Sequence, residues 1–182
     1  MSPGGGVRQV QINVSQQLRE PIGSTRSHEV DETVEIAGYE RHVEGRVSLV
    51  RTDRGILARG TLGTQVEVTC SRCLRQSPCV LTLAIEEEFF PTTDVLTGAP
   101  VPVPDDAAGS TIDEHHILDL TETVRQYGVL ALPMKPLCKE DCAGLCPTCG
   151  HNLNNGPCEC PKQEIDPRWA VLRKLAVSDD NG

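Results

Sequence analysis

Cysteines are the residues of this 182-residue chain whose type and spacing point most directly to chemistry. Four thiolates hold Zn²⁺ in a closed tetrahedron, with sulfur–metal bonds of about 2.3 Å. Six of the nine cysteines lie in residues 138–160, where Cys146-Pro-Thr-Cys149 has the spacing of a zinc knuckle. Cys158-Glu-Cys160 provides a second pair, and the intervening Asn155-Gly156 is a turn signal that brings the pairs together. The segment is therefore predicted to bind metal.

Eight of the cysteines form four pairs by their spacing, and these pairs can be assigned to metal sites in two ways. One grouping satisfies every pair with two zinc sites, the first of which ties the end of the chain to its early strands. The alternative gathers the cysteines of residues 138–149 around one ion. We prefer two sites, and because a closed four-thiolate site leaves no position for water, we expect both to be structural. The predicted ligands are Cys70, Cys73, Cys138 and Cys142 in the first site and Cys146, Cys149, Cys158 and Cys160 in the second.

Other thiol chemistry remains as an alternative. Disulfides or redox thiols are less expected, since a reducing compartment favours metal over disulfides, but an iron–sulfur cluster could use the same ligands. The remaining Cys79 lies in an apolar run and is interpreted as a small buried hydrophobe. The sequence shows no Ser-His-Asp set, phosphate-binding glycine loop or His-Glu-x-x-His motif. We therefore predict a protein that is not an enzyme and has no small-molecule substrate.

Alternating apolar residues predict the strands that position these cysteines. Residues 7–14 and 34–36 alternate, and residues 15–29 between them show no clear period. The best strand evidence lies in residues 43–70, where tight turns are expected at Asp53-Arg54-Gly55 and at Gly63, followed by a strand at 80–90.

Two short helices are expected. One begins at Asp119, with Glu122 three residues later as a capping box, and ends before Pro133. The other follows Asp166-Pro167 and carries an apolar stripe that includes Trp169. The predicted fold class is α+β, an antiparallel sheet of short strands with two short helices and a C-terminal zinc-ribbon-like cysteine cluster.

Two regions are predicted along the chain. Residues 1–137 form a mainly β domain with one helix and a Pro-rich acidic loop at about 91–111. Residues 138–177 form a cysteine-rich metal-binding tail packed on that domain. No apolar run is long enough to span a membrane, and the first residues lack the layout of a signal peptide. We therefore expect a cytoplasmic protein without membrane partners.

The net charge of −9 conceals a split along the chain. Residues 41–75 carry seven Arg and three acids, whereas residues 76–124 carry ten acids and no Lys or Arg. A solvated surface accounts for any single charge run. The sharper interpretation is a basic surface that meets RNA phosphate and an acidic one that meets a basic protein. The predicted RNA contacts are Arg51, Arg54, Arg59 and Arg72.

The tail motif, residues 132–160 followed by Asp166-Pro167-Arg168, resembles the YceD-type family of large ribosomal RNA subunit accumulation proteins. Cys70-Ser-Arg-Cys73-Leu, the Glu-rich strand ending at Phe89 and the helix ending in Ala131-Leu132-Pro133 match the same family in the same order. The resemblance covers about residues 40–175. It implies a role in the accumulation or processing of large-subunit ribosomal RNA.

The predicted function is a non-enzymatic factor for large-subunit ribosomal RNA accumulation and ribosome assembly, which binds pre-ribosomal RNA, a basic ribosomal protein, or both. One alternative is a zinc-stabilised protein-interaction adaptor that does not contact RNA. Another is a redox or iron–sulfur protein, and an iron–sulfur cluster would colour the purified protein.

Overall fold

The computed structural model describes residues 9–105, 107 and 109–161. The chain divides into two compact units, which are described separately. The first consists of Met1–Ser71 and Arg75–Cys138, and the second of Arg72–Leu74 and Lys139–Gly182. None of the helices within the described residues has the length and apolar character needed to cross a membrane.

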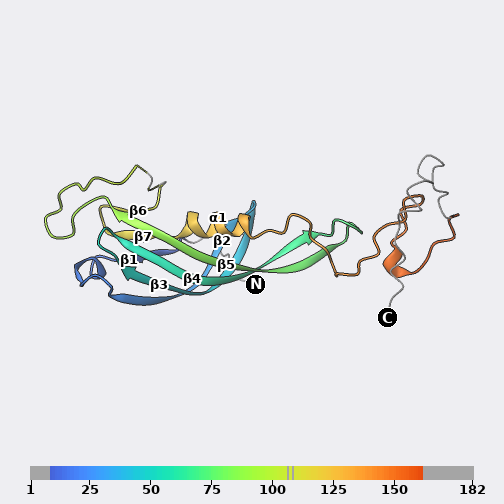
Figure 1. The fold of residues 1–182 in the computed structure, drawn as a ribbon, viewed down its shortest axis with the longest axis horizontal. Helices are drawn as coiled ribbons and strands as arrows, with labels where there is room; N and C mark the ends of the chain where they lie inside the picture. The colour runs from blue at the N-terminus through green and yellow to red at the C-terminus, as the bar shows by residue number, and fades with distance from the viewer. Residues whose placement is uncertain (1–8, 106, 108, 162–182) are drawn as a thin grey trace, which may run out of the picture. The chain divides into compact units, whose positions relative to one another are not determined.

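The first unit is a curled sheet of seven strands, in the order β1-β7-β6-β5-β4-β3-β2 (Figure 1). Four long strands follow one another as hairpins, and three short strands extend the sheet beyond β5. The long strands are β2 (Thr25–Ile36), β3 (Tyr39–Arg51), β4 (Ile56–Thr69) and β5 (Gln76–Pro91). The short strands are β1 (Gln11–Asn13), β6 (Thr111–Ile112) and β7 (Ile117–Asp119), and a 3₁₀ turn, η1, spans Gln17–Arg19.

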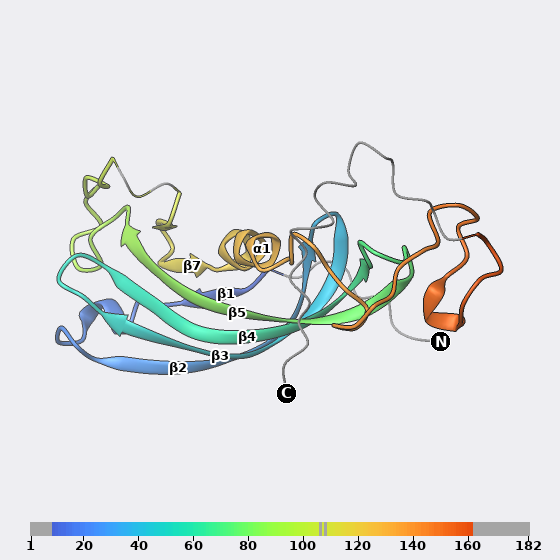
Figure 2. The ribbon, with the colours of Figure 1, turned by 45° about the vertical axis from the view of Figure 1, so that its right-hand side comes forward.

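Alternation along the long strands builds the core. Leu81, Leu83 and Ile85 of β5 are buried, while the residues between them are exposed. The helix α1 (Thr121–Leu130) lies against the sheet's concave face, as Figure 2 shows, and the Tyr127 hydroxyl donates to the Glu86 carbonyl oxygen at 3.0 Å. Its Val124 is fully buried. The core is therefore mainly aliphatic, with Phe89 as its one aromatic member among the buried residues of the cluster, and it lies between the helix and the sheet.

The predicted fold class is wrong in three respects. The sheet is mixed, because β5 and β6 run parallel, with Phe90 opposite Thr111. Its main strands are long, with 12 to 16 residues each. The described residues contain a single α-helix, and the helix predicted after Asp166-Pro167 lies outside them. The protein is thus mostly β.

Glycines explain why the strand lengths were underestimated. Gly63 does not form the predicted turn but lies inside β4, opposite Glu44 and Thr82. Gly60 is also internal, and a Cβ there would lie 2.3 Å from the Arg46 carbonyl oxygen. Such a position accepts only glycine, because the neighbouring backbone occupies the side-chain space. These glycines allow close strand packing instead of ending the strands.

The second unit has little regular structure. Its 3₁₀ turn η2 (Leu153–Asn155) follows an antiparallel bridge between Leu145 and Asn152. Among its described residues the buried apolar side chains are all cysteines, namely Cys73, Cys142 and Cys146. The predicted packing of residues 138–177 on the β domain stays a prediction.

Candidate metal centres

The first centre consists of Cys70, Cys73, Cys138 and Cys142, whose sulfur atoms all lie within 4.8 Å of one another. Strand β4 ends at Thr69, and a turn follows in which the Cys70 N–H donates to the Arg75 carbonyl oxygen at 2.9 Å. Cys70, Cys73 and Cys142 are buried, and Cys138 is half-buried. We name this set centre 1.

The second centre consists of Cys146, Cys149, Cys158 and Cys160, whose sulfur atoms also lie within 4.8 Å of one another. The Gly150 N–H donates to the Cys146 carbonyl oxygen at 2.9 Å, and Gly150 has a φ of 73°, which glycine adopts without strain. Cys146 is buried, whereas Cys149 is exposed. We name this set centre 2, and it is the more solvent-accessible of the two.

Both sets of thiols suit a single tetrahedral cation. Bonds of about 2.3 Å from zinc to four sulfurs separate the sulfurs by about 3.8 Å, which is compatible with the observed spacing. All eight ligands are soft sulfur donors, which select zinc or iron–sulfur clusters over hard cations. The structure thus brings the predicted residues together in the two predicted groups, each of which could hold a metal ion.

Backbone groups at centre 2 favour the thiolate form of one ligand. The N–H groups of Cys149 and Thr148 hydrogen bond to the Cys146 sulfur and lower its pKa to about 6. Cys160 behaves in the opposite way, because its contact with the Cys149 sulfur, followed by burial, raises its pKa to about 12. A bound cation would relieve this repulsion between sulfurs. The arrangement therefore has one thiolate ready near neutral pH, and metal binding would displace the other protons.

Sequence inspection missed two residues of these centres, Asn152 and Asn154. The Asn154 side-chain amide donates to the Cys142 sulfur at 3.3 Å and to the Asn152 side-chain oxygen at 2.7 Å. Their only signal was an Asn-rich run before Gly156, which was interpreted as a turn. Hydrogen bonds of this kind orient metal ligands.

The four arginines predicted to contact RNA all have intramolecular partners. Arg54 pairs with Glu88 at 2.9 Å and Arg59 pairs with Glu86 at 2.7 Å. Arg51 instead donates to backbone carbonyls, among them that of Gly55 at 3.0 Å. Arg72 donates to the Cys142 carbonyl oxygen at 2.9 Å.

The register of the sheet places the basic segment of the sequence next to the acidic one on neighbouring strands. Arg59 on β4 lies directly opposite Glu86 on β5, so basic and acidic segments meet side by side. Two ion pairs join the two segments, Arg54 with Glu88 and Arg59 with Glu86.

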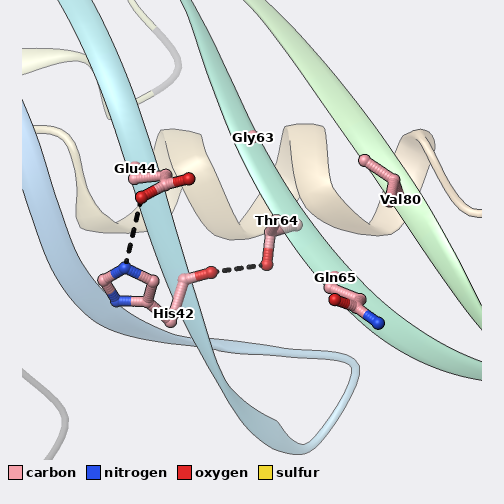
Figure 3. A pocket seen from close by; sticks show the side chains of 6 residues that line it. All are labelled: His42, Glu44, Gly63, Thr64, Gln65 and Val80. Carbon is pink, nitrogen blue, oxygen red and sulfur yellow. Dashed lines mark hydrogen bonds and ion pairs between the residues drawn. The ribbon is translucent and has the colours of Figure 1, made fainter.

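A hollow of about 370 Å³ lies over β3, β4 and β5, lined by His42, Glu44, Gly63, Thr64, Gln65 and Val80. Figure 3 shows the His42 ring turned toward Glu44, with 3.7 Å between the imidazole Nε2 and a carboxylate oxygen. The Thr64 hydroxyl donates to the His42 carbonyl oxygen at 2.7 Å. Because that hydroxyl is engaged by backbone, the lining residues form no pair of nucleophile and base.

Proteins of several organisms are similar to this chain in sequence. An uncharacterized protein of Mycobacterium tuberculosis is 36% identical over 124 residues, which is 66% of this chain and 56% of the relative's length. The chain thus spans little more than half of that mycobacterial protein. Bacillus subtilis YlbN, also uncharacterized, is 27% identical over 168 residues, 85% of this chain and 91% of the relative.

A further relative carries a functional name. It is the chloroplastic large ribosomal RNA subunit accumulation protein YCED homolog 1 of Arabidopsis thaliana, 23% identical over 154 residues, 73% of this chain and 48% of the relative. No solved structure matches the chain. Residues 58–176, which include all eight paired cysteines, match the family of large ribosomal RNA subunit accumulation proteins. The chain therefore belongs to the YceD family.

Proposed function

We propose that the chain is a non-enzymatic, zinc-stabilised binding factor that supports the accumulation of large-subunit ribosomal RNA in the cytoplasm. Family membership supports the role in ribosomal RNA accumulation. The observation that carries the mechanism is the pair of four-thiolate sets, because a metal held by four sulfurs has no open position for catalysis. Zinc there stabilises a binding surface.

Direct contact with pre-ribosomal RNA is the first part of this proposal, through Arg54 and Arg59. Their ion pairs lie on the surface, with the Arg54 side chain 57% exposed, and pairs of this kind contribute little net stability. A phosphate can therefore replace the carboxylate at small cost. We leave out Arg51 and Arg72, because their guanidinium groups already donate to backbone carbonyls.

Charge reversal tests the RNA contact. The double variant R54E/R59E should bind large-subunit ribosomal RNA more weakly, and the slope of log affinity against log salt should fall by about two. The matched control is R59E/E86R, which keeps the pair and the net charge. Unchanged binding and slope in R54E/R59E would favour the adaptor that does not contact RNA.

Contact with a basic ribosomal protein is the second part, and we place it at the edge strand β2. Strands β1 and β2 are the two edges of the sheet formed by the described residues, and both line one hollow of about 360 Å³. The β2 side of that hollow carries Glu29, Asp31 and Glu32. An acidic open edge suits an extended basic segment, which can add to the sheet through its backbone.

Affinity capture of the full chain from cells tests both parts together, with RNA and protein identified and metal measured in the same sample. Large-subunit precursors and a basic ribosomal protein should be recovered, and D31K/E32K should lose the protein but keep the RNA. Recovery of neither would contradict the proposal. Visible absorption of the purified protein distinguishes an iron–sulfur cluster from colourless zinc.

A further inference from the structure

We propose that Asn154 is a positioning residue that couples the two metal centres, so that metal in centre 2 raises the metal affinity of centre 1. The inference rests on the proposed metal binding and adds a connection between the sites. Its basis is one side chain, which comes from the loop of one centre and contacts a ligand of the other.

The loop that centre 2 closes contains Asn154. It runs from Cys149 to Cys158, and η2 lies within it. A metal that joins these two cysteines fixes both ends of the loop. Without that link, the eight residues between them must be ordered by hydrogen bonds alone, at a cost in conformational entropy.

Asn154 uses its whole amide group within this arrangement. Its Oδ1 accepts from the Ala143 N–H at 3.0 Å, and its Nδ2 donates to the Cys142 sulfur at 3.3 Å. The Asn152 side-chain oxygen accepts from both the backbone N–H and the Nδ2 of Asn154. The amide is therefore held in a single orientation, with its donor directed at a ligand of centre 1.

A hydrogen bond to a thiolate stabilises the charged, metal-binding form of the sulfur and fixes its direction. The backbone around Cys142 is tied to the same loop, because the Leu153 N–H donates to the Gly144 carbonyl oxygen at 2.9 Å and the Cys146 N–H donates to the His151 carbonyl oxygen at 2.8 Å. Ordering the loop thus prepares Cys142 for metal. By linkage, metal in centre 1 raises the affinity of centre 2 by the same factor.

The neighbouring Asn155 offers a matched control. It lies in the same 3₁₀ turn but is exposed. Of these two asparagines, Asn154 makes the contacts to Cys142 and Ala143. Substituting leucine at each position compares the same change in size and polarity with and without the sulfur contact.

The test is a double-mutant cycle on the full chain, with Co²⁺ and then Zn²⁺ titrated against a competing chelator. Its members are the wild type, N154L, C158S/C160S and N154L/C158S/C160S. A separate variant, C70S/C73S, disables centre 1 and so gives the spectroscopic signal of metal in centre 2 alone. N154L should weaken centre 1 at least tenfold, as loss of an outer hydrogen bond typically does, while N155L leaves it unchanged. Disabling centre 2 should weaken centre 1 at least fivefold in the wild type and have no further effect in N154L.

Equal affinities of N154L and N155L at centre 1, or the same loss from C158S/C160S with and without Asn154, would overturn the coupling. A second measurement needs no substitution at Asn154. In protein loaded with ¹¹³Cd, the side-chain amide protons of Asn154 should show scalar coupling to the cadmium of centre 1, and its absence refutes the contact. If the wild type takes up no metal at all, the proposed function fails; two metals without coupling refute only the role of Asn154.

Discussion

The two units of the protein differ in the side chains that they bury. The first unit buries a continuous apolar cluster that is aliphatic except for Phe89, and in it Leu49, Leu62 and Leu83 are almost completely inaccessible to solvent. In the described part of the second unit, the buried apolar side chains are the cysteines Cys73, Cys142 and Cys146. A sheet with that much buried apolar surface can fold through the hydrophobic effect, whereas a segment whose core is sulfur depends on a cation.

This difference shows what each unit contributes to binding. The sheet has an apolar core of its own, and the proposed RNA and protein contacts lie on its strands and in the turn between β3 and β4. The cysteine segment has no such core among its described residues, so we expect its shape to depend on bound metal. Changes that affect one unit and spare the other therefore test the comparison.

Metal removal should have the largest effect. Chelation under reducing conditions should unfold residues 139–161, because structural zinc contributes on the order of 10 kcal/mol to the folding of small metal-bound segments. Amide hydrogen exchange should become fast there and stay slow in β3, β4 and β5. The control is the same chelator saturated with zinc, and loss of both units in a single transition would contradict the comparison.

Removing one ligand from each centre should have a smaller effect, unequal between the centres. Centre 1 joins Cys73 to Cys138 across 64 residues, and centre 2 joins Cys149 to Cys158 across 8. The first loop is eight times as long as the second, which is three doublings, and each doubling adds about 0.6 kcal/mol to the entropy cost of closing a loop. C70S should therefore lower the free energy of unfolding by about 2 kcal/mol more than C158S. Metal counting should give one ion per chain in each variant, and an unchanged count in C70S would refute centre 1.

Glycine substitutions in β4 should affect the sheet alone. A Cβ at Gly60 would lie 2.7 Å from the Val47 Cα, so G60A should destabilise the first unit by about 1–3 kcal/mol. At Gly63 the nearest atom, the Glu44 carbonyl oxygen, lies at 3.8 Å, so G63A should be neutral or stabilise by up to about 1 kcal/mol. Thermal unfolding and metal counting check both variants, and metal loss in G60A would show that the two units do not fold independently.

Sequence spacing predicted the cysteine groups because the pairs are local features. Cys146 and Cys149 are close whatever the rest of the chain does, and the only choice left was which pair joins which. The helix at residues 121–130 was also predictable from its apolar spacing and its end before Pro133. Such features depend on neighbours in the chain.

The features that sequence inspection missed depend on strand register or on the fold of a loop. The pairing of Arg59 with Glu86, 27 residues apart, follows from the β4–β5 alignment and is invisible in a count of charges. The parallel pairing of β6 with β5 crosses a long loop, and local alternation carries no information on strand direction. The contact of Asn154 with Cys142 likewise requires the fold of the loop.

The smallest predicted effect concerns Glu122 in the first turn of α1. Hydrogen bonds from Arg125, at 2.7 and 2.5 Å, and from Gln126 lower its pKa to about 2. Since the folded state holds this carboxylate ionised, its contribution is complete above the usual pKa of 4.5 and is lost as the pH falls from there to about 2. E122Q should therefore be less stable than the wild type at pH 7, and the difference should vanish near pH 2.

R125Q is the matched variant for this prediction, because it removes the main donor and leaves the carboxyl group. It should remove most of the same pH-dependent contribution, and E122Q/R125Q should show little further loss, since both changes break one interaction. Urea unfolding at several pH values measures all three. Because Glu122 lies on the helix that covers the sheet, the metal affinities should not change in any of these variants, and a change in either centre would contradict the separation of an aliphatic unit from a sulfur-based one.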